Sequence, residues 1–207
     1  MKLTIGKVSL AVIGATTLIG WNFYAKLPNL MATHWDLSNK VNGYTEKFWF
    51  LTMMPALMLG LLCLMLVLPR LDPKVKNIKT FSTIYEGLVL LMMLFLSYMQ
   101  ILVILFNLGY AVNMTQLIAP GLSILFTYIG FVMKNAKQNW TVGIRTPWTL
   151  SSENVWNKTH IWAGKWLLIC SPLLMLGLLV PSITFYLIAI PILVLLGSVI
   201  YSYRLSR

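Results

Sequence analysis

The chain has 207 residues, of which 58% are hydrophobic and only 10% are charged. An ordinary soluble domain carries about 25% charged residues, and a domain of this size leaves much of its surface in contact with solvent. The composition therefore excludes an ordinary soluble fold and indicates that most of the apolar surface faces lipid.

The formal net charge of +11 raises the question of a nucleic-acid partner. The Lys and Arg residues form no basic arm or face, and they lie in short clusters at the ends of apolar runs, where membrane anchors are found. We therefore expect no direct nucleic-acid binding. Cys63 and Cys170 lie inside apolar runs without metal-ligand spacing, which is typical of packing residues.

Six apolar runs are long enough, or nearly so, to cross a bilayer, which takes about 20 residues of helix. The first run follows Lys2 and Lys7 like a signal peptide, but Tyr24-Ala25-Lys26 lacks the small residues of a cleavage site, so we expect a retained anchor. The predicted class is an all-α, multi-pass membrane protein. In chain order, the predicted spans are residues 8–24, 48–68, 87–106, 112–133, 162–180 and 183–203.

The spans contain few polar residues. Proline residues fall within four of them, and neighbouring helices can satisfy the carbonyl groups that these prolines free. Gln100 lies deep in the third span, and we expect it to hydrogen-bond a neighbouring helix. The prolines concerned are Pro55, Pro120, Pro172 and Pro191.

The loops divide the cations unevenly. With the amino terminus in the cytoplasm, 13 of the 16 Lys and Arg residues fall on the cytoplasmic side, which predicts that both termini are cytoplasmic. We expect two parts: residues 1–69 with the outer loop 25–47, and residues 70–207 with the inner loop 134–161. The outer set is Lys26, Lys40 and Lys47, and the inner set is Lys2, Lys7, Arg70, Lys74, Lys76, Lys79, Lys134, Lys137, Arg145, Lys158, Lys165, Arg204 and Arg207.

The outer loop is predicted to form a compact cap over the helix ends. Asn42-Gly43 is a turn signal, and Asn39 is a second residue that tolerates a positive φ angle. His34, Asp36 and Glu46 lack a recognised metal-ligand spacing, so an ordered cap is favoured over a metal site. The candidate ligand contacts of this loop are Pro28, His34, Trp35, Gly43, Tyr44 and Lys47.

The inner loop combines tryptophans with a stiff basic segment. Thr149 or Ser151 can cap a helix with Glu153 in its first turn, and Pro147 keeps Thr146 out of a helical conformation. Arg145 then has three candidate partners: lipid phosphate, Glu153 or an acidic protein. The simplest interpretation of the tryptophans is a strip lying in the inner headgroup layer. They are Trp140, Trp148, Trp156, Trp162 and Trp166.

Nothing in the sequence predicts catalysis. No nucleophile elbow, P-loop or HExxH sequence is present, and we expect no cofactor and no metal. His34 and His160 fall on opposite sides of the predicted membrane, so the only two histidines cannot share one ion.

The two loops together resemble the SdpI family of bacterial membrane immunity proteins. The outer loop resembles the family's amino-terminal domain, with Asp36 where Asn is common and Asn39 where Gly is common. Glu46 likewise replaces a small residue. The inner motif that resembles the family signature is Gly143-Ile144-Arg145-Thr146-Pro147-Trp148-Thr149-Leu150, followed by Glu153 and Trp156.

The resemblance implies a multi-pass cell-membrane protein that protects its cell against a secreted peptide toxin, and it makes the inner motif the candidate functional segment. It also implies a possible second role, in which the toxin-bound protein captures a cytoplasmic winged-helix repressor. Such coupling requires two states with different contacts. Two alternatives stay open at this point: a small transporter or exporter, and, with less support, an enzyme embedded in the membrane.

Overall fold

The computed structural model describes residues 3–36 and 38–207, so Lys2 of the predicted inner set lies outside the described residues. Six helical stretches are long and apolar enough to cross a membrane, which confirms the predicted number of spans. In chain order the elements are α1 (Leu3–Asn22), β1 (Leu30–Trp35), β2 (Val41–Glu46), α2 (Lys47–Leu71), α3 (Val75–Thr80), α4 (Ser82–Asn107), α5 (Met114–Asn135), α6 (Pro147–Ser151), α7 (Glu153–Cys170), η1 (Ser171–Leu178), η2 (Pro181–Ile183) and α8 (Thr184–Leu205).

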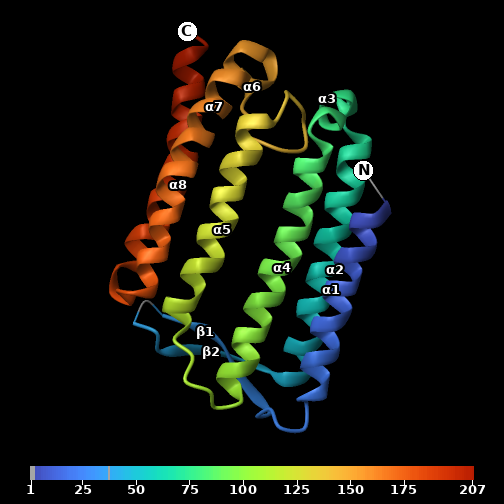
Figure 1. The fold of residues 1–207 in the computed structure, drawn as a ribbon, viewed down its shortest axis with the longest axis vertical. Coiled ribbons are helices and arrows are strands. Elements are labelled where there is room, and N and C mark those ends of the chain that lie inside the picture. The colour runs from blue at the N-terminus through green and yellow to red at the C-terminus, as the bar shows by residue number, and fades with distance from the viewer. Residues whose placement is uncertain (1–2, 37) are drawn as a thin grey trace.

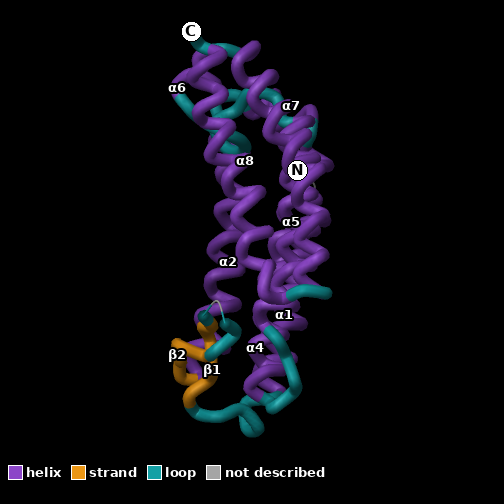
Figure 2. The backbone as a smooth tube through the Cα atoms, turned by 90° about the vertical axis from the view of Figure 1, so that its left-hand side faces the viewer, coloured by secondary structure: helices purple, strands orange, loops and turns teal. Residues whose placement is uncertain are grey.

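The six long helices run side by side between two capped ends (Figure 1). One end carries the β1–β2 hairpin and the short connections 108–113 and 179–183, and we call it the hairpin end. The other carries α3, α6 and the segment 136–146, and both termini lie towards it, so we call it the terminal end. Figure 2 shows the strands at one extremity of the bundle and the short helices at the other.

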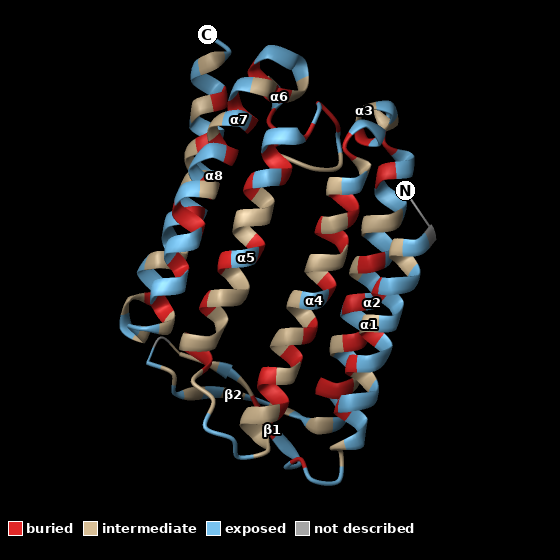
Figure 3. Ribbon diagram, viewed as in Figure 1, coloured by how far each residue is buried: buried red, intermediate tan, exposed pale blue. Residues whose placement is uncertain are grey.

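The outward faces of the bundle are apolar, as lipid contact requires. Leu18, Met53 and Leu193 are 73%, 61% and 64% exposed, an arrangement that water would penalise over so large a surface. Buried residues line the inward faces of the helices (Figure 3). The chain is therefore a multi-pass membrane protein.

The fifth span differs from the prediction at its amino-terminal side. It was expected from residue 162, but α7 begins at Glu153, nine residues earlier. Hydropathy alone misses these first turns because Asn154 and Lys158 are polar, and both are exposed. The span then tightens into the 3₁₀ segment η1, which starts beside Pro172, a residue without a backbone N–H donor.

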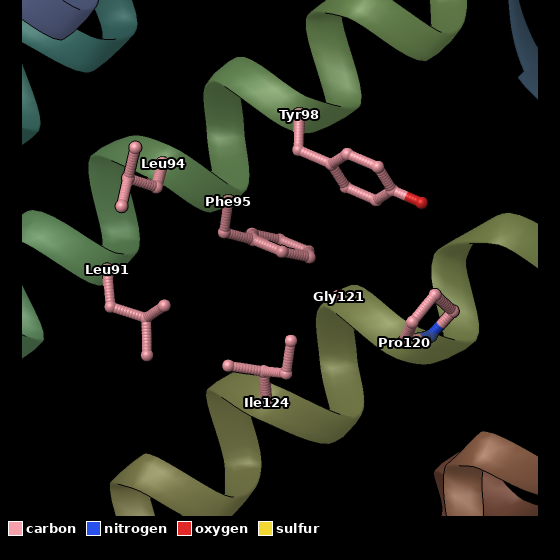
Figure 4. Close-up of a pocket in the computed structure, with 7 residues that line it drawn as sticks. All are labelled: Leu91, Leu94, Phe95, Tyr98, Pro120, Gly121 and Ile124. Carbon is pink, nitrogen blue, oxygen red and sulfur yellow. The ribbon is translucent and has the colours of Figure 1, made fainter.

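Helix α4 packs against α1, α2 and α5, while α5 packs against α7, η1 and α8. Between α4 and α5, the Tyr98 hydroxyl donates to the Leu117 carbonyl at 2.6 Å, and the Tyr128 hydroxyl donates to the Ile84 carbonyl at 3.0 Å. Figure 4 shows Phe95 and Tyr98 directed from α4 towards α5, where they line an apolar groove of about 340 Å³. The division of the chain near residue 70 stays a prediction, because packing joins α4 to both of its neighbours.

Two polar side chains inside the bundle, those of Tyr85 and Gln100, differ in whether they form a hydrogen bond. The Tyr85 hydroxyl donates to the Met65 carbonyl at 2.7 Å, the group that Pro69 leaves without its helical donor. Gln100 is fully buried, and neither of its amide atoms has a hydrogen-bond partner among the described residues. The predicted bond from Gln100 to a neighbouring helix is therefore wrong.

Candidate functional site

Residues 136–152 fold into a compact layer over the terminal end, which we call the terminal cap. Asn139 is fully buried and organises its first turn: Oδ1 accepts the N–H groups of Thr141 and Val142, at 2.8 and 2.7 Å. The amide of the same side chain donates to the carbonyls of Lys137 and Val142. One side chain thus satisfies four backbone groups that the turn leaves outside regular structure.

A buried aromatic pair anchors the middle of the cap. Trp156 and His160 stack with ring centroids 3.9 Å apart, and the Trp156 indole N–H donates to the Ala136 carbonyl at 2.8 Å. His160 Nε2 accepts the Ile144 N–H at 2.9 Å, and Nδ1 lies 2.8 Å from the Trp156 carbonyl. These partners select the neutral tautomer with its proton on Nδ1. His160 is therefore a structural residue of the cap.

Gly143 lies directly on this aromatic pair. Its φ angle is +122°, in the region that favours glycine. A Cβ atom at this position would stand 2.4 Å from His160 Nε2 and 3.0 Å from Trp156. The positive φ angle and the lack of space for a Cβ atom each require glycine at this position of the motif.

Threonines hold the next part of the motif. Thr146 is extended, as predicted from Pro147, and it caps α6 through a reciprocal capping box with Thr149. The buried Thr149 hydroxyl also donates to the Ile144 carbonyl at 2.7 Å, and Thr146 Oγ1 lies 3.1 Å from Ser202 Oγ of α8. The motif is thereby joined to the last helix of the chain.

The cap of α7 is one residue away from the prediction. Either Thr149 or Ser151 was expected to cap it, but Ser152 is the N-cap residue, and its hydroxyl accepts the Val155 N–H. Glu153 lies in the first turn as expected, where a carboxylate is favoured by the helix dipole. The difference arises because the chain makes the separate short helix α6 before α7 begins.

Asp72 links the terminal cap to the first half of the bundle, and sequence reasoning missed it. The carboxylate is buried, with Oδ2 accepting the Trp140 N–H at 2.8 Å and the Thr141 hydroxyl at 2.6 Å. Oδ1 accepts the Lys74 N–H at 2.7 Å. One feature of the sequence could have indicated a role for Asp72, because it is one of only five acidic residues in the chain.

Gln138 makes a second link, also missed. Its amide donates to the carbonyls of Thr149 and Leu150, while the Lys74 ammonium group donates to its Oε1. The Asn77 side chain donates to the Gln138 carbonyl at 2.7 Å. The loop after α2 and the helix α3 are thus tied to the motif by side chains that no local pattern connects.

Two motif side chains remain at the surface. Arg145 is exposed, and it donates to the Trp140 carbonyl at 2.6 Å instead of pairing with Glu153, so one of its three predicted partners is not used. Trp148 packs on Tyr203 with ring centroids 4.9 Å apart. Beside Trp148 lies a groove of about 530 Å³, lined by Pro147, Trp148, Ser151, Ser152, Asn154, Val155, Leu205 and Ser206.

The five tryptophans do not form one strip. Trp156 is completely buried, whereas Trp140 and Trp166 are 52% and 43% exposed. A common headgroup role therefore fails for Trp156, which packs inside the cap.

At the hairpin end, the turn predicted at Asn42-Gly43 is wrong, whereas the positive φ angle expected at Asn39 is confirmed. Asn42 and Gly43 are part of β2, and Gly43 pairs with His34 across the two-stranded sheet. The chain turns between Asp36 and Lys40, with Asn39 at a φ angle of +60°. Asn is one of the few residues that tolerate this conformation, which explains how it can stand where glycine is common in the resembling family.

Polar contacts fasten the hairpin to the bundle. The Asn107 amide at the end of α4 bonds both backbone groups of Ala32, at 2.8 and 2.9 Å. Asn39 Oδ1 accepts the Thr115 N–H in the first turn of α5. Lys47 donates to the Leu27 carbonyl at 3.1 Å. The hairpin is therefore a compact cap fastened to the helix ends, as predicted.

The predicted ligand contacts of the hairpin end divide into structural and exposed residues. Pro28, His34 and Tyr44 are exposed, Gly43 lies against the His34 Cβ, and Trp35 packs edge-on against a neighbouring ring. None of the six lines the cavity at this end. That cavity, of about 500 Å³, is lined by Ser38, Asn39, Asn113, Thr115, Pro181, Ser182, Phe185 and Tyr186.

The acidic residues of the hairpin have local roles. Asp36 Oδ1 accepts the N–H groups of Ser38 and Lys40, and the His34 ring bonds Asn42. Among residues 3–36 and 38–207, no group of three or more His, Cys, Asp and Glu side chains is arranged to hold a metal.

Comparisons with known proteins agree with the two motifs. Residues 135–202, which include the whole terminal cap, match the SdpI/YfhL protein family, and residues 11–59 match a domain of unknown function, DUF1648. The chain is 28% identical over 199 residues to the "Immunity protein SdpI" of Bacillus subtilis (strain 168), an alignment that covers 94% of this chain and 90% of that protein. No solved structure matches the chain. The resemblance read from the motifs is confirmed.

Proposed function

We propose that this membrane protein protects its cell against a secreted antimicrobial peptide, because residues 135–202 match the SdpI/YfhL family and the similarity to an immunity protein runs along nearly the whole chain. It acts by binding, without turnover. The observation that carries the proposal is the construction of the family motif: a rigid cap that leaves Arg145 and Trp148 at its surface.

The charge distribution supports a direction for this function. The described cations of the predicted inner set lie in the segments of the terminal end or in the parts of the long helices nearest to it, and the three outer lysines lie in or beside the hairpin. By the positive-inside rule the hairpin end faces outward and the terminal end faces the cytoplasm. A secreted peptide then meets the hairpin and the cavity beside it, whose rim carries Tyr186, 76% exposed.

The test of immunity is survival. Cells that express the chain are challenged with candidate toxic peptides, and the full-length protein is expected to raise the lethal dose. Arg145→Ala and Trp148→Ala should reduce this protection while membrane insertion is unchanged. Trp140→Ala is the matched control, since Trp140 is an exposed tryptophan of the same cap. Unchanged protection in both motif variants would refute a role for this surface.

The hairpin-end cavity is tested separately. Tyr186→Ala should weaken crosslinking of the peptide to the protein, because an aromatic side chain at a cavity rim contributes strongly to binding. Tyr110→Ala is the control, since Tyr110 is 63% exposed at the same end but does not line the cavity. Equal crosslinking in both variants would place the peptide elsewhere.

Capture of a cytoplasmic winged-helix repressor is a second step of the proposal. The groove beside Trp148 supports it, because it joins the family motif to the end of α8 at the surface that we assign to the cytoplasm. The expected result is co-purification of a repressor only from peptide-treated cells, with loss in Trp148→Ala. Co-purification that does not depend on the peptide would contradict a switch between two states.

A further inference from the structure

A polar cavity of about 320 Å³ opens at the terminal end between α5 and α7, apart from the groove beside Trp148. Lys134, Asn135 and Lys137 line it from the end of α5 and the start of the terminal cap. Asn157 and Ile161 line it from one face of α7, and His160 contributes to its wall. The cavity is large enough for a small anionic group.

Close contact of the two helices shapes this cavity. A Cβ atom on Gly164 of α7 would stand 2.7 Å from the Gly130 carbonyl of α5 and 2.6 Å from Lys134 Cγ. The Lys134 side chain therefore packs against α7 at Gly164, where a Cβ atom would take its space. This close contact holds the first part of its stem in place near the cavity.

The charge of the cavity is positive and uncompensated. No acidic side chain lines it, and neither Lys134 nor Lys137 has an ion-pair partner within the part of the chain that the structure describes. Both ring nitrogens of His160 are already committed to the backbone, so the two lysines supply the charge. Exposed lysines without ion-pair partners, next to amide side chains between two helices, supply the kind of donors from which a phosphate group accepts hydrogen bonds.

The surroundings indicate the source of the phosphate. The cavity lies near the ends of two helices that are long and apolar enough to cross a membrane. Ile161 at the cavity and Ile169 further along α7 are 54% and 52% exposed, and the exposed Lys165 lies between them, so an apolar flank runs along α7 beside a further cation. A phosphate group with attached acyl chains fits both parts of this surface, whereas free phosphate uses only one.

We propose that this cavity binds the phosphate of an anionic phospholipid. A bound headgroup connects the end of α5 to α7 and lies against the wall formed by His160, so it stabilises the terminal cap. Ala136, between the two lysines, accepts the Trp156 indole N–H, which connects the site directly to the buried aromatic pair. This inference is independent of the peptide and of the membrane orientation.

The test uses the purified full-length chain in neutral detergent. Dioleoylphosphatidylglycerol is expected to raise the melting temperature and to remain bound in native mass spectrometry, whereas dioleoylphosphatidylcholine does neither. Lys134→Gln/Lys137→Gln should lower the affinity for phosphatidylglycerol about tenfold or more, since each cation near an anionic lipid contributes measurably to binding. Lys134→Arg/Lys137→Arg should retain it.

The matched control removes the same charge from another part of the terminal end. Lys76→Gln/Lys79→Gln on α3 should bind phosphatidylglycerol as the wild type does, because both lysines are exposed outside this cavity. An equal loss in the control would show general surface attraction and overturn the site. Stabilisation by inorganic phosphate equal to that by the lipid would overturn the assignment to a phospholipid.

Discussion

Gly143 combines a backbone conformation and a contact that no other residue satisfies. Gly143→Ala places a methyl group against His160 and forces an L side chain into a φ angle of +122°. We expect a loss of about 2–5 kcal/mol in the free energy of unfolding, from strain and overpacking together. Reversible unfolding in mixed micelles measures it.

The control for Gly143 is another glycine-to-alanine change. Gly60 lies in α2 with no atom within 4 Å of an added Cβ. Gly60→Ala should leave stability unchanged or raise it by up to about 1 kcal/mol, because alanine favours the helix. Equal effects of the two substitutions would contradict the close contact of Gly143 with the aromatic pair.

Asp72 needs both of its oxygens as acceptors, and this requirement gives a second prediction. In Asp72→Asn, one end of the amide must face a backbone N–H or the Thr141 hydroxyl as a donor, whichever way it turns. We expect about 1–3 kcal/mol of destabilisation and faster proteolysis of the terminal cap. Asp36→Asn is the control: Asp36 uses a single oxygen for both of its N–H partners, so an amide replaces it without loss. A smaller effect at Asp72 than at Asp36 would contradict the bridge.

For individual residues, the sequence predicts a structural role where that role depends on neighbours in the chain. It misses the role where a residue contacts a distant segment. Pro147 and Glu153 behave as expected, since the restriction of the residue before a proline and the helix dipole are local effects. Asp72 and Gln138 owe their roles to contacts across more than 60 residues. No spacing rule in the sequence connects such positions.

Pro69 in α2 leaves the Met65 carbonyl without its helical donor, and the Tyr85 hydroxyl of α4 donates to that carbonyl instead. This contact between two helices gives a testable prediction. Tyr85→Phe should cost about 1 kcal/mol, because the Met65 carbonyl then lacks both the Pro69 N–H and the Tyr85 hydroxyl. In a Pro69→Ala background the helix supplies its own donor, so the same change should cost less. Unfolding of all four proteins gives the interaction energy, expected to be at least about 0.5 kcal/mol.

The control cycle uses the second tyrosine of α4. Tyr98 donates to Leu117, a carbonyl that Pro120 does not deprive of its donor, since Pro120 lies three residues further on. Tyr98→Phe and Pro120→Ala should therefore be closer to additive. A coupling as large as that between Tyr85 and Pro69 would show that the carbonyl freed by proline is not the cause.

Elements were predicted well where hydropathy decides and poorly where side-chain chemistry decides. All six spans were found, because about 20 apolar residues have few alternatives to a membrane helix. The helix with Glu153 in its first turn was expected, but hydropathy placed the start of the fifth span nine residues later. The turn expected at Asn39 is present, whereas the one expected at Asn42-Gly43 is not, because strand pairing overrides the local turn preference of these two residues.

For the whole molecule, the separation of the two capped ends is structural, while their assignment to compartments follows from charge. Asn42 and Asn154 are exposed at opposite ends of the bundle, so they report the orientation directly. After replacement of Cys63 and Cys170 by alanine, a cysteine at position 42 should react with an impermeant maleimide in intact cells. A cysteine at position 154 should react only after the membrane is permeabilised. Reaction of both in intact cells would remove the basis for a protein that meets a peptide outside and a partner inside, and the reverse pattern would invert the orientation that the cation distribution predicts.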